Sequence, residues 1–168
     1  MLYKSTINLT KKINFFNIRK YYFRNKNEEV EKLNEIFNDT TYNKEKLLKM
    51  NSSHSFVSLI QLNTGFRISE PVFAKLEHCI LEHDIPHLWV KKTEFCDRKT
   101  KSSIRAVPLY GVSLDAAKEL YKIAKRCNSE WFVPAYARQN GNTSCSAIIN
   151  KTLRKYEFRT HMFRHAII

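Results

Sequence analysis

Glycine is scarce in this sequence, with only Gly65, Gly111 and Gly141 among 168 residues. Phosphate-binding loops of the P-loop or dinucleotide kind need clustered glycines, because the backbone must come close to the phosphates. The wide separation of these three residues excludes both kinds of loop. Long apolar runs are lacking too. No run approaches the length that crosses a bilayer, and the N-terminus has no continuous apolar segment like that of a secretory signal.

Closely spaced cysteines are also missing. The four cysteines, Cys79, Cys96, Cys127 and Cys145, form no C-x-x-C pair, so neither a zinc ribbon nor a redox motif is indicated. We expect reduced thiols and a cytoplasmic protein.

A group of histidines and cysteines near residue 80 fits no common zinc pattern. His83 and His87 have the spacing of one helix face, but Pro86 between them disfavours a helix. We therefore expect neither a metal site nor a cofactor, and interpret the group as surface or loop residues. It consists of His78, Cys79, His83, His87 and Cys96.

Acidic residues are few relative to basic ones. There are 16 Asp and Glu against 29 Lys and Arg, which gives a formal net charge of +13. Such a surplus favours a polyanionic partner, and nucleic acid is the first candidate because Lys and Arg release counterions from its phosphates. Charge alone leaves open a soluble basic protein without such a partner. Hydrophobic residues make up 43% of the chain, enough for the core of one domain, or of one domain and a partial one.

The apolar spacing predicts a mainly α protein with one small antiparallel β-sheet, an α+β fold. Two strands are expected at residues 88–90 and 104–107, around a basic hairpin tip at 99–103, and residues 131–134 read as a short buried segment. Gly65 is expected to end its helix in a left-handed conformation. The expected helices cover residues 28–37, a segment around 47–50, 52–64, 66–76, 113–126 and 143–156, with a last helix from about His161.

Three separated strings carry the candidate chemistry: TGFRISE at 64–70, KTKSSIRAVPL at 99–109 and THMFRH at 160–165. We expect Arg67 and Glu70 on one helical face, and likewise His161 and Arg164. Arginine forks bind phosphate oxygens, while a lysine and a histidine can move protons near neutral pH. Each string alone also has an ordinary interpretation: an intrahelical ion pair, an exposed turn lysine or a solvated helix end. No dense carboxylate cluster is present, so a two-metal nuclease is disfavoured.

Taken together, in this order and rough separation, the three strings resemble the catalytic domain of the tyrosine recombinases, the phage integrase family. The resemblance runs from about residue 41 to residue 168. It implies a helical domain with a small sheet. It also implies DNA integration by strand exchange through a 3′-phosphotyrosyl link, without metal or nucleotide.

By resemblance, Arg67 and Arg164 form a phosphate clamp, and Glu70 orients the active site. Lys99 is the expected general acid toward the 5′-oxygen, with Lys101 as the alternative because hairpin length varies. His161 handles protons. The residues expected to bind DNA are Arg67, Lys99, Lys101, Arg105 and Arg164.

The nucleophilic tyrosine of the family lies beyond the position of Arg164, whereas all eight tyrosines here precede Arg164. We therefore expect a catalytic domain that is partial over 41–168 and does not cleave DNA alone. We expect residues 1–40, a short basic segment rich in Asn and aromatics, to be the remnant of a helical DNA-binding domain or a linker. The missing helices should leave Phe163, Ile167 and Ile168 exposed.

The expected partners are double-stranded DNA and other recombinase protomers, with no membrane. When bound to DNA, the cytoplasmic protein would be associated with the nucleoid. An alternative is a catalytically silent basic DNA-binding protein that interferes with or assists a full-length recombinase. A third interpretation is an RNA-binding or metal-binding domain unrelated to recombination.

Overall fold

Helices dominate the computed structural model of the chain, which describes residues 52–96 and 104–167, with side chains up to residue 164. The sheet is small and antiparallel, so the predicted fold class is confirmed. The α-helices are α4 (Ser53–Thr64), α5 (Ser69–Val72), α6 (Val112–Arg126), α7 (Gly141–Leu153) and α8 (Thr160–Ile167). The 3-10 turns are η2 (Leu76–His78), η4 (Pro134–Tyr136) and η5 (Arg154–Tyr156), and the strands are β1 (Cys79–Ile80), β2 (His87–Val90) and β3 (Arg105–Pro108).

The sheet has the order β1-β2-β3, with both neighbouring pairs antiparallel. The predicted strands at 88–90 and 104–107 are confirmed as β2 and β3. The two-residue strand β1 was not expected, because it is too short to show an alternating pattern. Leu88 and Val90 are buried on the inner face of β2, and Arg105 lies opposite Val90 in the register.

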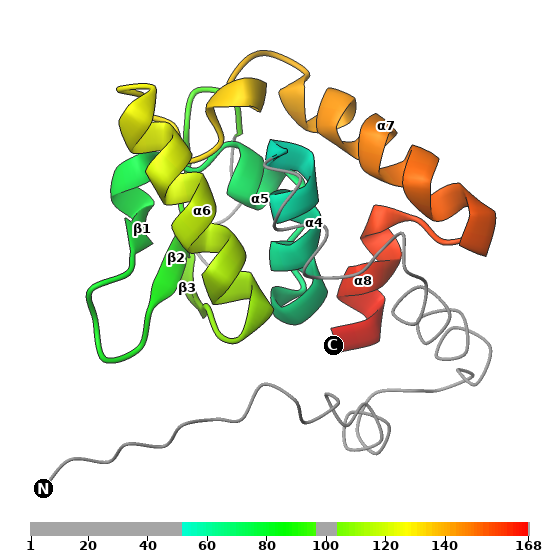
Figure 1. Ribbon diagram of the computed structural model, residues 1–168, viewed down its shortest axis with the longest axis horizontal. Coiled ribbons are helices and arrows are strands. Elements are labelled where there is room, and N and C mark those ends of the chain that lie inside the picture. The colour runs from blue at the N-terminus through cyan, green and yellow to red at the C-terminus, as the bar shows by residue number, and fades with distance from the viewer. Residues whose placement is uncertain (1–51, 97–103, 168) are drawn as a thin grey trace, which may run out of the picture.

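Helix α4 lies at the centre of the helical layer, where it packs against α6, α7 and α8. Figure 1 shows α6 on one side of α4 and α8 on the other. The end of α4 is as the sequence predicts. Gly65 adopts a left-handed φ of 64°, and its N–H donates to the carbonyl of Gln61. This conformation suits glycine because it has no Cβ.

The segment after Gly65 differs from its prediction. A helix was expected over 66–76, but only the four residues of α5 are α-helical. The chain then leaves the helix to pair with a distant segment: Leu76 N–H donates to the Glu130 carbonyl at 2.7 Å, and Phe132 N–H to the Ala74 carbonyl at 2.9 Å. These long-range bonds satisfy backbone groups that a longer helix would use, so tertiary pairing overrides the local pattern.

The buried core joins the inner face of the sheet to α4 and the helices around it. Phe163 belongs to this core with 1% exposure, so its predicted exposure is wrong. The reason is that α8 packs against α4 and α7, and the Phe163 ring lies 5.0 Å from that of Phe158, centroid to centroid. The side chains of residues 167 and 168 lie outside the described part.

The group near residue 80 is only partly a surface group. His83 is exposed, but His78 and Cys79 are buried, which contradicts their interpretation as surface residues. They are buried because η2 and β1 add to the edge of the sheet and cover part of the core. His78 Nδ1 accepts the N–H of Lys75 at 3.2 Å, and burial lowers the pKa of the imidazole.

All four cysteines are free thiols, as predicted. Burial raises the pKa of Cys79 and Cys145 to about 12, so both remain neutral at ordinary pH. Over residues 52–96 and 104–167, no three His, Cys, Asp or Glu side chains gather into a metal-binding group. None of the helices in this part is both long and apolar enough to span a membrane. The helices predicted at 28–37 and 47–50 and the hairpin tip lie outside the described residues.

Candidate functional site

Arg67 stands in the short loop between α4 and α5, and its side chain is exposed. The loop is fixed from both sides. Gln61 Nε2 donates to the carbonyl of Phe66 at 3.1 Å, and the Phe66 ring is buried. In the part of the chain that the structure describes, the Arg67 guanidinium has no hydrogen-bond or ion-pair partner. The loop therefore holds the backbone of Arg67 and presents its charged fork to solvent.

Glu70 is the buried carboxylate of this site, with none of its side chain exposed. Its Oε2 accepts the backbone N–H of Arg67 at 2.9 Å, while the N–H of Glu70 donates to the Arg67 carbonyl at 2.8 Å. The expected placement of the two side chains on one helical face is therefore wrong, and so is the ordinary interpretation as an intrahelical ion pair. Arg67 precedes α5, and Glu70 binds its backbone instead of its guanidinium.

Glu70 forms an ion pair with Arg105, on the strand β3. Arg105 Nη2 donates to Glu70 Oε2 at 2.9 Å, and the Arg105 side chain is 37% exposed. Nothing in the spacing of the sequence indicates this pair, because 35 residues separate its members. The predicted DNA-binding residue Arg105 thus has an intramolecular partner within the motif that contains Arg67.

His161 and Arg164 lie one helical turn apart on α8, as predicted, and α8 packs against α4, the helix that leads to Arg67. His161 is exposed and Arg164 is half-buried. Phe163, between them in sequence, points into the core. No described residue pairs with the Arg164 guanidinium. Arg67 thus follows α4 and Arg164 lies on α8, and these two helices are in contact.

The start of α8 is fixed by a residue that the sequence did not single out. Asn150, on α7, accepts the N–H of Thr160 through Oδ1 at 2.9 Å. The same side chain donates to Ser146 Oγ at 3.1 Å, and Ser146 Oγ lies 3.4 Å from Thr160 Oγ1. Asn150 thereby satisfies a backbone donor of the first turn, which has no acceptor within its own helix.

Lys99 and Lys101 lie outside the described residues, but the chain leading to them is well anchored. Thr93 and Cys96 exchange two backbone hydrogen bonds of 3.1 Å. Within this turn, Glu94 accepts from Lys75 Nζ at 2.8 Å, and the Phe95 ring lies 5.1 Å from that of Trp131. Lys75 also donates to Glu130 at 3.1 Å, and its Nζ lies 3.7 Å from the centre of the Trp131 ring. The turn is thus held to the body of the protein by charge and aromatic contacts.

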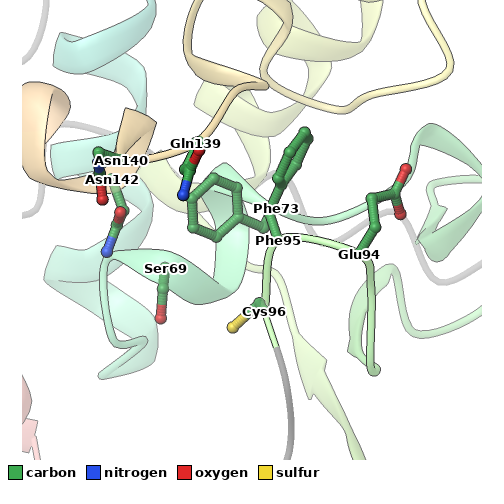
Figure 2. A pocket seen from close by; sticks show the side chains of 8 residues that line it. All are labelled: Ser69, Phe73, Glu94, Phe95, Cys96, Gln139, Asn140 and Asn142. Atoms are coloured by element: carbon green, nitrogen blue, oxygen red, sulfur yellow. The ribbon is translucent and has the colours of Figure 1, made fainter.

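An open hollow of about 630 Å³ lies between α5, this turn and the start of α7. Figure 2 shows its three amide side chains on one side and Glu94 on the other. Ser69 contributes to the lining, whereas Arg67 and Arg164 do not, so the hollow adjoins the arginine site without containing it. Its lining residues are Ser69, Phe73, Glu94, Phe95, Cys96, Gln139, Asn140 and Asn142.

Comparison with known proteins gives one family and one solved structure. Residues 24–168 match the model of the phage integrase family. The structure of the Tn1549 transposon integrase in complex with transposon right end DNA is similar at 20% identity with a TM-score of 0.45. That alignment covers 80% of this chain and 55% of the integrase chain. A comparison with curated proteins gave no match.

Proposed function

The chain belongs to the phage integrase family, and we propose that it binds duplex DNA and holds a backbone phosphate between Arg67 and Arg164. The proposal rests mainly on one observation, the fixed backbone and exposed guanidinium of Arg67. Its backbone is fixed by a fully buried carboxylate, while its guanidinium is exposed and unpaired among the described residues. A fixed arginine with free donors is suited to a phosphate, because the planar fork binds two oxygens and stays charged.

The second half of the clamp comes from α8. Arg164 is half-buried and, among the described residues, unpaired, and its helix packs against α4 and is capped by Asn150. A preorganised guanidinium of this kind stabilises negative charge that develops on a phosphate during strand transfer. The formal charge of +13 supports the same partner, since long-range attraction draws a basic surface toward DNA.

The proton-transfer roles rest on the family resemblance. Lys99, or Lys101 in its place, would protonate the 5′-oxygen of the cleaved strand, and His161 would accept or return a proton. The exposure of His161, one turn before Arg164, is compatible with that role. Strand cleavage also needs a tyrosine beyond Arg164. Because all eight tyrosines precede it, we propose that a polypeptide of residues 1–168 binds DNA without cutting it.

Binding is tested by fluorescence anisotropy on labelled duplex DNA over a range of salt concentrations. Arg67→Ala and Arg164→Ala should each weaken binding and reduce the slope of log K against log salt by about 0.9 or less, the value for one phosphate contact. Arg126→Ala, at the exposed end of α6, is the matched control for loss of one positive charge. Unchanged affinity and slope in both clamp variants would refute the clamp.

Cleavage is tested separately with a nicked suicide duplex, which traps a covalent protein–DNA adduct. We expect the 168-residue polypeptide to form none, while it still binds the same duplex in the anisotropy assay. An adduct would show that one of the eight tyrosines, or another nucleophile of this chain, attacks the phosphate. It would also exclude a catalytically silent DNA-binding protein.

A further inference from the structure

A single oxygen atom joins Arg67 and Arg105. Glu70 Oε2 accepts the backbone N–H of Arg67 and the Nη2 group of Arg105, each at 2.9 Å. The Glu70 side chain has no exposed surface, so the shared acceptor is buried, whereas the Arg105 side chain is 37% exposed. Through it, the strand β3 is tied to the loop that presents Arg67 to solvent.

We propose that Arg105 is a positioning residue for Arg67 that acts through Glu70, and not primarily a contact to DNA. The inference rests on the proposed function, in which Arg67 holds a phosphate. Arg105 is predicted from sequence as one of five DNA-binding residues. The structure gives its guanidinium an intramolecular partner, whereas the Arg67 guanidinium has none among the described residues.

The physical argument starts from the cost of burying a carboxylate. A buried charge is tolerated only when a partner and hydrogen bonds compensate for its lost hydration. Arg105 supplies the opposite charge and a directed donor, and it thereby holds Glu70 Oε2 where it accepts the N–H of Arg67. Hydrogen bonds that involve a charged group are shorter and stronger than those between neutral groups. Supporting contacts of this type hold a binding group in its productive geometry.

The competing interpretation is direct DNA contact by Arg105. Its side chain is 37% exposed, and a guanidinium has further N–H groups besides the one that binds Glu70. The two interpretations differ in how the loss of Arg105 combines with the loss of Arg67. A positioning residue has nothing left to position once Arg67 is removed. An independent phosphate contact loses its full contribution in either background.

The experiment is a double-mutant cycle on the full 168-residue chain with Arg67→Ala, Arg105→Ala and both together. Anisotropy binding to duplex DNA is measured across salt, with Arg126→Ala as the control. We expect Arg105→Ala to weaken binding, and the double variant to bind as Arg67→Ala alone does, within about twofold, the usual scatter of such cycles. If the two losses multiply and the salt slope falls by the sum of the single changes, Arg105 is a DNA contact and the proposal is wrong.

A readout that needs no DNA is hydrogen exchange at the Arg67 amide, followed by NMR. Arg105→Ala should speed this exchange, Arg105→Lys should restore most of the protection, and Arg126→Ala should not change it. If Arg105→Ala does not fold, Arg105→Lys takes its place in the cycle. In Arg105→Lys, a single ammonium replaces the guanidinium fork, so we expect a smaller loss of DNA binding than in Arg105→Ala. When Arg67→Ala is already present, Arg105→Lys should cause no further loss. Exchange that is unchanged in every folded Arg105 variant overturns the proposal.

The two readouts separate failure of the inference from failure of the proposed function. Suppose that exchange at Arg67 speeds up in Arg105→Ala, but Arg67→Ala binds DNA with unchanged affinity and slope. Then the positioning contact exists, and the phosphate clamp does not. If exchange at the Arg67 amide is unchanged but Arg67→Ala weakens DNA binding and lowers the salt slope, the phosphate clamp exists and the positioning contact does not.

Discussion

The contact between Asn150 and the start of α8 offers a sharp test of how the fold presents Arg164. Replacing Asn150 with Ala removes the acceptor of the Thr160 N–H, which is 2.9 Å away, and the donor to Ser146. Thr160 is buried, with 5% exposure, so water does not readily replace the lost acceptor. Asn150→Ala should therefore lower the stability of the protein in two ways: α8 loses its N-terminal cap, and a buried N–H is left without an acceptor.

The expected cost is about 1.5 kcal/mol in the free energy of unfolding, the middle of the range for these two effects. For a chain of this size, that corresponds to a fall in Tm of about 3 to 6 °C. Urea unfolding followed by circular dichroism measures the first quantity and a thermal scan the second. Because Arg164 depends on the placement of α8, the variant should also bind duplex DNA more weakly.

Two further variants make the result specific. Asn150→Asp keeps an acceptor and places a negative charge near the start of α8, which the helix dipole favours, so it should keep most of the stability. Asn142→Ala, on the same helix as Asn150, removes an amide for which the structure shows no hydrogen bond to the described residues. It should be close to neutral. If Asn150→Ala is no less stable than Asn142→Ala, the account of how α8 is held is refuted.

Three other predictions concern stability. Burial lowers the pKa of His78 in the folded state below that of the unfolded chain. The contribution of neutral His78 to the free energy of unfolding is therefore complete above pH 6.5 and is lost as the pH falls below it. Urea unfolding from pH 7 to 5 should show this fall, and His78→Asn, which keeps an acceptor for the Lys75 N–H, should reduce it; an equal slope in the variant would count against the assignment. Phe163→Ala should cost about 3 to 5 kcal/mol as a buried aromatic truncation, measured in the same assay. Gly141→Ala would place a Cβ onto the backbone carbonyl of Tyr136, so a loss of about 1 to 3 kcal/mol is expected in urea, and wild-type stability would contradict this crowding.

The local elements of the fold could be predicted from the sequence wherever the pattern is long or a special residue marks an end. Helix α6 was expected at 113–126 and covers Val112–Arg126, because its apolar residues recur over four turns. The left-handed Gly65 marks the end of α4. The strand β1 escaped prediction since two residues show no period, and α5 is shorter than expected because Ala74 and Leu76 pair with the segment around Trp131.

In the candidate site, too, some features could be predicted from the sequence and others could not. The order and spacing of Arg67, His161 and Arg164 are visible in the sequence, and the last two share α8 as predicted. The contacts that support them are not visible, because each depends on how distant segments pack. The Glu70 carboxylate meets Arg105 across 35 residues, and Asn150 meets Thr160 across a turn whose path the sequence does not reveal.

The central claim is that Arg67 and Arg164 hold the same backbone phosphate. A crystal structure of this chain bound to duplex DNA tests it most directly. The account predicts both guanidinium groups within about 3 Å of the oxygens of one phosphate, the usual hydrogen-bond distance. Arg67 and Arg164 on phosphates of different nucleotides, or on opposite faces of the protein, would contradict it.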